Sequence, residues 1–144
     1  MIDVRIKKLN ENAVIPKYAK LGDAGMDLTA VSVRYDDKIN CWVYGIGLAF
    51  EIPKGYVGLI FPRSSSREKD PTMANCVSVI DSGYRGEVEI SFKDRPQLDF
   101  EQPYNVGDRV AQMIIIPYPE INFILSDTLS ESERGTGGHG STGK

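Results

Sequence analysis

Residues 41–52 read CWVYGIGLAFEI, and large apolar side chains stand at every second position of this stretch. One alternating set consists of Trp42, Tyr44, Ile46, Leu48, Phe50 and Ile52. The other set has smaller side chains and consists of Val43, Gly45, Gly47 and Ala49. A period of two is that of a β-strand, whose successive side chains point to opposite faces of a sheet. The stretch therefore predicts a long strand, with the two glycines as the points at which it can break.

The same alternation recurs in shorter segments, each bounded by Gly, Pro, Asn or Asp. Further strands are expected at residues 2–6, 28–35, 56–61, 77–80, 87–92, 109–116 and 121–125. No stretch has a sustained helical repeat, and the best helical candidate is a short turn around residues 65–70 that Pro71 stops. Many short strands at regular spacing favour an all-β fold, as a sandwich, a jelly roll or a barrel.

Length and charge limit the class of protein. With 144 residues, 41% of them apolar and 26% charged, the chain suits one domain and is too short for two. Apolar runs such as residues 113–117 fall far short of the ~20 residues of a membrane helix, and Asp3, Arg5 and Lys7 interrupt any apolar leader. We therefore expect a cytoplasmic protein with no membrane partner. A net charge of −3 argues against nucleic acid as a partner, because binding its backbone normally requires a basic patch.

Residue types that bind metals or form disulfides are few. Cys41 and Cys76 lie on apolar segments without CxxC spacing, so we expect reduced thiols rather than a disulfide or a metal pair. The chain has a single histidine, His139, and its carboxylates are scattered. This pattern argues against a structural zinc or iron site. Any metal should be a hard ion, bound through oxygen and carried largely by a substrate.

The composition changes after Leu129, where the last residues read SESERGTGGHGSTGK. This tail has no large aliphatic side chain, so residues 1–129 are predicted to form the folded domain and residues 130–144 a mobile arm. The spacing GxxxxGK at 138–144 superficially matches a phosphate-binding P-loop, but the strand, the helix and the final Ser/Thr of that motif are missing. Successive glycines can still form a nest of backbone N–H donors, which together with Arg134 is typical of a mobile phosphate clamp.

Four further segments place polar groups next to predicted strands. Residues 61–66 (FPRSSS) offer a guanidinium and hydroxyls, although alone they could form a polar surface loop. Residues 107–112 (GDRVAQ) could be a hairpin turn with a weak Asp–Arg surface pair, and residues 23–28 (DAGMDL) a turn entering a strand. Residues 75–87 (NCVSVIDSGYRGE) are the most specific, and their simplest interpretation is a β-hairpin in which Asp81 caps its own turn.

Taken in order, five segments resemble the signature motifs of the trimeric dUTPase family. They are AGMDL at 24–28, PRSS at 62–65, VIDSGYRGE at 79–87, GDRVAQMII at 107–115 and RGTGGHGSTG at 134–143. The resemblance covers the chain from about residue 23 to residue 144. It implies a jelly roll or distorted β-barrel that forms a homotrimer with a flexible glycine-rich C-terminal arm. Each active site would then combine three motifs from one subunit, the VIDSGYRGE hairpin from a second and the arm from a third.

The resemblance also implies an activity. The protein would be a dUTP diphosphatase that hydrolyses dUTP to dUMP and diphosphate with Mg²⁺. This reaction would limit uracil incorporation into DNA and supply dUMP for thymidylate synthesis. Asp81 would be the general base that deprotonates the attacking water. Asp27 would hold the network of water and metal, binding the ion through water while the ion rests mainly on the triphosphate.

The remaining roles are carried over residue by residue from the same motifs. The phosphates would be bound by Arg63, Ser64, Ser65, Gln112, Arg109, Arg134, Gly140, Ser141 and Thr142. The uracil and deoxyribose would be bound by Asn75, Ser78, Val79, Ile80, Tyr84 and His139. At His139 the family usually has a phenylalanine that stacks over the uracil. The imidazole can stack as well, with less area.

Three alternatives remain open from the sequence. A related all-β trimer family deaminates dCTP, and released ammonia rather than diphosphate would identify that activity. A nucleotide-gated regulatory protein would bind a protein partner in a manner that depends on dUTP. A structural trimer with a vestigial site is disfavoured because Asp81, Tyr84, Arg134 and Ser141 are all present.

Overall fold

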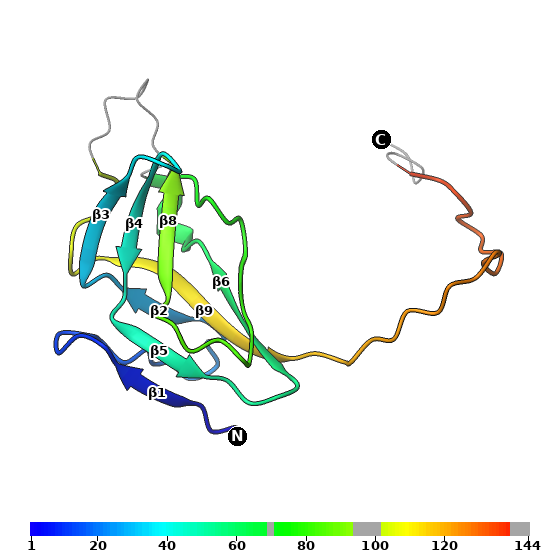
Figure 1. Ribbon diagram of the computed structural model, residues 1–144, viewed down its shortest axis with the longest axis horizontal. Helices are drawn as coiled ribbons and strands as arrows, with labels where there is room; N and C mark the ends of the chain where they lie inside the picture. Colours follow the sequence, from blue (N-terminus) through cyan, green and yellow to red (C-terminus); the bar gives the residue numbers. More distant parts are fainter. Residues whose placement is uncertain (69–70, 94–101, 139–144) are drawn as a thin grey trace.

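The computed structural model describes residues 1–68, 71–93 and 102–138, which form nine β-strands and one short helix. The strands are β1 (Arg5–Lys8), β2 (Met26–Thr29), β3 (Ser32–Asp36), β4 (Cys41–Gly45), β5 (Leu48–Glu51), β6 (Tyr56–Phe61), β7 (Ser78–Ile80), β8 (Glu89–Lys93) and β9 (Arg109–Pro117). The helix, η1, is a 3-10 helix at Ser64–Glu68. All the strand pairs are antiparallel, in sheets ordered β1–β5, β2–β9–β6–β7 and β3–β4–β8 (Figure 1). The all-β class expected from the sequence is confirmed.

One hydrophobic core joins the sheets. β9 lies between β2 and β6, and its Val110 and Met113 are fully buried. From the three-stranded sheet, Tyr44 and Phe92 enter the same core and pack edge to face, with their ring centroids 5.8 Å apart. Burial of apolar surface is the main favourable contribution to folding. This core therefore fixes β2, β6 and β9 relative to one another, and their ends carry most of the predicted phosphate-binding residues.

The long strand predicted at 41–52 breaks at its glycines, as expected. β4 ends at Gly45, and Gly47 has a φ of +67°, a left-handed conformation that favours glycine. A side chain at Gly47 would also collide with its surroundings, because an added Cβ would lie 2.8 Å from Cβ of Asn10. Residues of both alternating sets are buried, since Val43 and Ala49 are nearly as inaccessible as Tyr44 and Ile46, whereas Trp42 is only partly buried. The chain changes sheet at this break, because β4 pairs with β3 and β8 whereas β5 pairs with β1.

Other expected elements differ in detail. Residues 28–35 form two strands rather than one, because β2 ends at Thr29 and the pairing with β9 shifts register there. The strand predicted at 121–125 is wrong, since no strand follows β9 among the described residues up to 138. These residues have the apolar content of a strand, but no other strand of the described chain pairs with them, and a lone strand has no ladder hydrogen bonds. The helical turn predicted near 65–70 is confirmed as η1.

After β9 the chain leaves the sheets and extends away from them (Figure 1). Its large apolar side chains are therefore exposed to solvent, and Phe123 and Leu125 are 91% and 99% accessible. Exposure of so many large apolar groups in one segment is unusual for a surface that remains free. No helix in the described residues is both long and apolar enough to cross a membrane.

Candidate functional site

Three strand ends bring a carboxylate and two guanidinium groups together. Asp27 on β2 accepts hydrogen bonds from Arg63 Nε at Oδ1 (2.7 Å) and from Arg63 Nη2 at Oδ2 (3.3 Å). Arg109, the first residue of β9, donates to the same Oδ2 at 3.0 Å. The two arginines lie 36 and 82 residues from Asp27 in the sequence, so only the sheet unites them. Planar guanidinium groups suit bidentate pairing with carboxylates and phosphates.

Gln112 lies beside this cluster. It is paired with Asp27 across β2 and β9 and with Phe61 across β6 and β9. Its Nε2 donates a 2.9 Å hydrogen bond to the carbonyl of Pro62. Gly25 leaves room for this amide, because an added Cβ would lie 2.5 Å from Gln112 Oε1. The hydrogen bond to Pro62 and the space left by Gly25 together set the orientation of the Gln112 amide.

The loop after β6 supplies hydroxyl groups to the same place. Arg63 Nη1 donates to Ser65 Oγ at 2.9 Å. Ser64 and Ser65 are exposed at the start of η1, whereas Ser66 is buried. Arg63 Nε and Arg63 Nη1 therefore orient a carboxylate on one side and an exposed hydroxyl on the other. This arrangement brings together Asp27, Arg63, Ser65, Arg109 and Gln112 from the residues that the sequence suggested.

A buried hydrogen-bond network anchors η1 to the core. Ser66 Oγ lies 3.0 Å from the hydroxyl of Tyr104. Tyr44 joins this network, because its hydroxyl donates to the carbonyl of Tyr104 and accepts from the backbone N–H of Tyr104, both at 3.0 Å. Burial raises the pKa of Tyr44 to about 12, since the ionised phenolate would lose its hydration. The sequence placed Ser66 in a segment rich in hydroxyl groups but did not predict its burial, and Tyr104 lies in no motif with a chemical signature.

A cavity of about 330 Å³ opens beside the cluster and is lined by Lys17, Ala19, Asp23, Ala24, Gly25, Asp27 and Gln112. Its lining joins the predicted Asp27 and Gln112 to a cation, Lys17, which the sequence did not single out. Lys17 lies in an aperiodic segment, so no pattern marked it. The cavity is polar, and it adjoins the arginine pair through Asp27, which both arginines contact.

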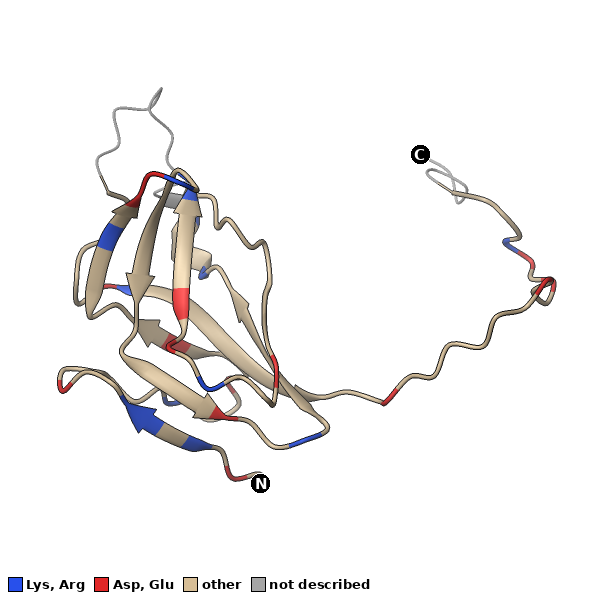
Figure 2. Cartoon of the chain, in the orientation of Figure 1, with Lys and Arg blue, Asp and Glu red and all other residues tan. Residues whose placement is uncertain are grey.

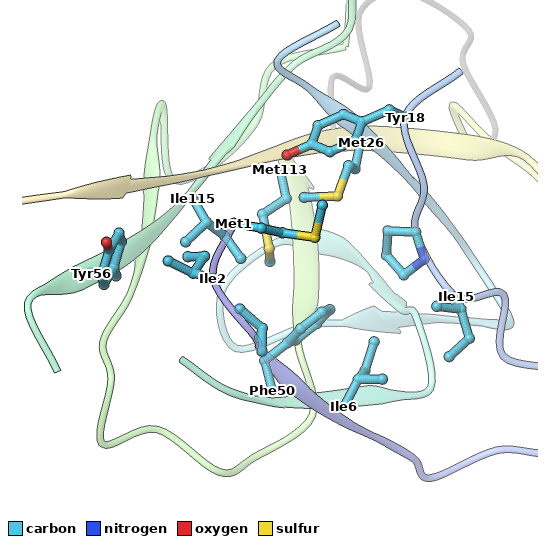
Figure 3. Close-up of a pocket in the computed structure, with 12 residues that line it drawn as sticks. Met1, Ile2, Ile6, Ile15, Tyr18, Met26, Phe50, Tyr56, Met113 and Ile115 are labelled. Atoms are coloured by element: carbon cyan, nitrogen blue, oxygen red, sulfur yellow. The ribbon is translucent and has the colours of Figure 1, made fainter. Parts of the chain in front are cut away.

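A larger cavity of about 580 Å³ lies elsewhere and is apolar (Figure 3). It is lined by side chains from β1, β2, β5, β6 and β9, including Ile6, Met26, Phe50, Tyr56 and Met113. Met1 and Tyr18 also line it. No residue suggested as catalytic or phosphate-binding lines this cavity, so its size does not identify it as the reaction site.

The hairpin expected to bind the base carries its residues on and around β7. Ser78, Val79 and Ile80 form β7, and Asn75 is exposed just before it. Asp81 follows directly and is exposed. Its backbone carbonyl accepts from the N–H of Tyr84 at 3.1 Å, which closes a tight turn. Tyr84 remains 44% exposed.

Within one chain, Asp81 and the arginine cluster lie at opposite ends of β6. β7 pairs with β6 so that Ser78 is opposite Ile60 and Ile80 is opposite Gly58. Asp81 therefore lies beyond Gly58, whereas Arg63 lies five residues along in the other direction. At about 3.3 Å per residue, this register separates the two by roughly 15 Å or more along the strand. The predicted base therefore lies away from the arginine cluster within one chain.

Of the site residues predicted on the arm, the structure describes Arg134. Arg134 lies on the extended segment and donates from Nε to the carbonyl of Gly137 at 3.0 Å. The other predicted arm residues, His139, Gly140, Ser141 and Thr142, lie outside the described residues. No group of three or more His, Cys, Asp or Glu side chains in the described ranges could hold a metal ion. Cys41 is buried and Cys76 is exposed.

Comparison with known proteins identifies the family. The dUTPase family model matches residues 11–143. A deoxyuridine 5'-triphosphate nucleotidohydrolase from Clostridioides difficile is 38% identical over 144 residues and covers 99% of both chains. A relative of the same name from Picosynechococcus is 38% identical over 141 residues, with 97% of this chain and 98% of its own covered.

Solved structures agree with these relatives. A mutant of the Staphylococcus bacteriophage 80alpha dUTPase with dUpNHpp superimposes with a TM-score of 0.83, at 26% identity and full coverage of both chains. A mutant dUTPase from phage phi11 of S. aureus, described as coordinating a structural Mg(II) ion, gives a TM-score of 0.71 at 25% identity, covering 88% of this chain and 98% of its own. The chain belongs to the dUTPase family and is an enzyme that hydrolyses dUTP.

Proposed function

We propose that dUTP is hydrolysed at sites shared between the subunits of a homotrimer. The observation that supports this most strongly is the separation of Asp81 from the arginine cluster along β6. A general base must come within hydrogen-bond reach of its water, so residues roughly 15 Å or more apart cannot serve one phosphate group. A second subunit that brings its turn after β7 to the arginine cluster removes this difficulty.

In this arrangement, each subunit contributes a different part of the chemistry. Asp81 of one subunit deprotonates the attacking water, and Arg63, Ser64, Ser65, Arg109 and Gln112 of another bind and orient the triphosphate. Positioning and charge stabilisation supply most of the rate in such a reaction. Arg134, Gly140, Ser141 and Thr142 of the arm close over the phosphates, and His139 stacks on the uracil. Asn75, Ser78, Val79 and Ile80 bind the base, and Tyr84 packs on the deoxyribose.

The residues present fit a magnesium ion that arrives with the substrate. Both oxygens of Asp27 already accept guanidinium donors, which disfavours direct coordination and leaves lone pairs for bound water. Asp27 is the residue that would hold the hydrated ion, with the triphosphate supplying the remaining oxygen ligands. When bound, Mg²⁺ would draw negative charge from the phosphorus as the water attacks.

Exposed apolar surface supports association. The segment after β9 exposes Ile121, Phe123, Ile124, Leu125 and Leu129, which a neighbouring subunit would cover. The segment also carries the acidic residues Glu120, Asp127, Glu131 and Glu133, whereas β1 carries Arg5, Lys7 and Lys8 (Figure 2). Opposite charges on two exposed segments of one chain favour contact between copies.

Subunit mixing tests the shared site. Asp81→Asn and Gln112→Glu each remove one half of the site, and the second places a negative charge where phosphate would bind. After the two inactive variants are unfolded and refolded together, an intact Asp81 and an intact Gln112 meet in about a quarter of the sites of a symmetric oligomer. We expect diphosphate release from dUTP to return to about that fraction of the wild-type rate.

The matched control mixes Asp81→Asn with Tyr84→Ala, because both changes lie on the same turn. No intact turn then exists in either chain, so activity should not return. Recovery in the control, or no recovery with Gln112→Glu, would contradict sites shared between subunits.

A further inference from the structure

The turn after β7 is fastened to another part of the fold by the side chain of Glu87. Its Oε1 accepts a 2.7 Å hydrogen bond from the backbone N–H of Gly47. The carboxylate lies over Gly45, where an added Cβ would come within 2.6 Å of Oε1. The next residue, Val88, donates from its N–H to the carbonyl of Leu48 at 3.0 Å. A carboxylate makes a stronger bond to a backbone N–H than a neutral acceptor does, so Glu87 holds the end of the turn to the connection between β4 and β5.

The ring of Tyr84 is held at the same point. Its hydroxyl donates a 2.8 Å hydrogen bond to the backbone carbonyl of Glu87. The ring lies over Gly86, where an added Cβ would collide with the hydroxyl oxygen. Because the hydroxyl is already engaged, Tyr84 presents its aromatic ring to a ligand rather than its hydroxyl.

Arg85 makes a second and weaker attachment. Its Nη1 donates to the carbonyls of Ser82 and Tyr84, which stiffens the turn internally. Outside the turn, Arg85 forms an ion pair of 3.7 Å with Glu51, and both side chains are about half exposed. Exposed ion pairs contribute little. Within the described residues, the Glu87 carboxylate is therefore the main side-chain attachment that fixes this turn in place.

We propose that Glu87 is a positioning residue that sets discrimination against ribonucleotides by acting through Tyr84. The inference rests on the proposed role of Tyr84 in packing against deoxyribose. Exclusion of a 2′-hydroxyl by contact requires a ring that does not yield. With Glu87 bound to Gly47, the Tyr84 ring is fixed over Gly86. Without that bond, the ring and the turn can move together and admit the additional oxygen of UTP.

The test measures kcat and KM for dUTP and UTP in Glu87→Ala, Glu87→Gln and Glu89→Ala. Glu87→Ala removes the acceptor, and we expect the UTP/dUTP ratio of kcat/KM to rise about 10-fold, equivalent to about 1.4 kcal/mol. The change should lie mainly in KM. Glu87→Gln retains an oxygen acceptor for Gly47 N–H and should keep the ratio within about twofold of the wild type. Glu89 pairs with Arg34 on an exposed surface, so its removal should leave the ratio unchanged.

Gly45→Ala gives a second approach if Glu87→Ala does not fold. The new Cβ would lie 2.6 Å from both Glu87 Oε1 and Ser32 Oγ, so both side chains must shift, and the same rise in the ratio is expected from displacement of the carboxylate. Ser32→Ala, which removes the second contact alone, is the control and should leave the ratio unchanged. An equal loss of kcat for both nucleotides, or Glu87→Gln behaving as Glu87→Ala, would show a purely structural role and overturn the proposal. A further outcome concerns Tyr84 itself. If the wild-type protein hydrolyses dUTP and Tyr84→Ala leaves the UTP/dUTP ratio unchanged, the proposed role of Tyr84 is contradicted, and this inference with it.

Discussion

Arg63 and Arg109 donate to the same carboxylate oxygen, Oδ2 of Asp27. The two guanidinium groups are thereby held side by side, although each carries a full positive charge and they would otherwise repel. A single carboxylate thus gathers two cations at the ends of β6 and β9, at the place where the triphosphate is proposed to bind. The carboxylate is an organiser of the anion site rather than a free ligand.

Asp27→Asn should destabilise the folded protein. The substitution removes a charged acceptor of three guanidinium hydrogen bonds, and such bonds contribute about 1–3 kcal/mol in partly buried settings. We expect the free energy of unfolding, measured by urea titration, to fall by that amount with an unchanged m-value. Asp36→Asn is the control, because Asp36 pairs with Arg34 at the surface and should cost under about 1 kcal/mol. Equal losses in the two variants would contradict the organising role of Asp27.

Gly25→Ala should reduce dUTP hydrolysis by displacing the side chain of Gln112. Its new Cβ would lie 2.5 Å from Gln112 Oε1, and the end of a flexible side chain can move away at little cost to stability. The phosphate-binding amide would then be misplaced, so kcat/KM for dUTP should fall about as much as in Gln112→Ala. Because both changes act on one group, the double variant should be no worse than either single variant. Additive losses would show that Gly25 acts independently of Gln112.

The raised pKa of Tyr44 predicts that the folded protein loses stability at alkaline pH. Its pKa is about 12 in the folded protein against an ordinary 10, so the stabilising contribution is complete below pH 10. Between pH 10 and 12 the unfolded chain ionises while the folded one stays protonated, so the free energy of unfolding falls as pH rises. The fall attributable to Tyr44 is at most about 3 kcal/mol.

Tyr44→Phe should remove that part of the pH dependence. The variant is expected to be less stable at neutral pH, because it loses two buried hydrogen bonds with Tyr104, but its profile from pH 10 to 12 should be flatter. Tyr118→Phe is the control, because Tyr118 is 44% exposed. Parallel profiles for wild type and Tyr44→Phe would contradict the assignment.

Phe123→Asp should weaken subunit association. The side chain is 91% exposed in the single chain, so a charge there costs little in the monomer but would be buried unpaired in an interface. Sedimentation should show a fall from about 48 kDa, three times the 16.0 kDa chain, toward the mass of one chain, with parallel loss of activity. Ser126→Asp adds the same charge to a polar position of the same segment and should leave the mass unchanged. An unchanged mass in Phe123→Asp would show that the segment does not support the trimer.

The sequence allowed the prediction of elements better than of their assembly. Period-two alternation located most strands, and the glycines at 45 and 47 marked a real break. The alternation did not show that the chain changes sheet after Gly45. It also failed at 121–125, because apolar composition reports a need for burial and does not say whether the partner lies in the same chain.

The prediction of the site was limited in the same way, because single motifs were recognisable but their contacts were not. The motifs around Asp27, Arg63 and Arg109 were visible individually, but their contact depends on strand register, which residue types alone do not determine. Ser66 and Glu87 lie in segments that the sequence marked, but their bonds to Tyr104 and Gly47 were not predicted, since no spacing connects partners so far apart in the chain. The separation of Asp81 from the arginine cluster likewise became visible only from the pairing of β6 with β7.

The most direct measurement is diphosphate release from dUTP, dCTP, dTTP and UTP in the presence of Mg²⁺, with wild type and Asp81→Asn compared at equal folded concentration. Turnover should be confined to dUTP, and loss of the general base should reduce it by about 10²-fold or more with little change in KM. Asp81→Asn that retains the wild-type rate would contradict the assignment of the base and the shared site built on it.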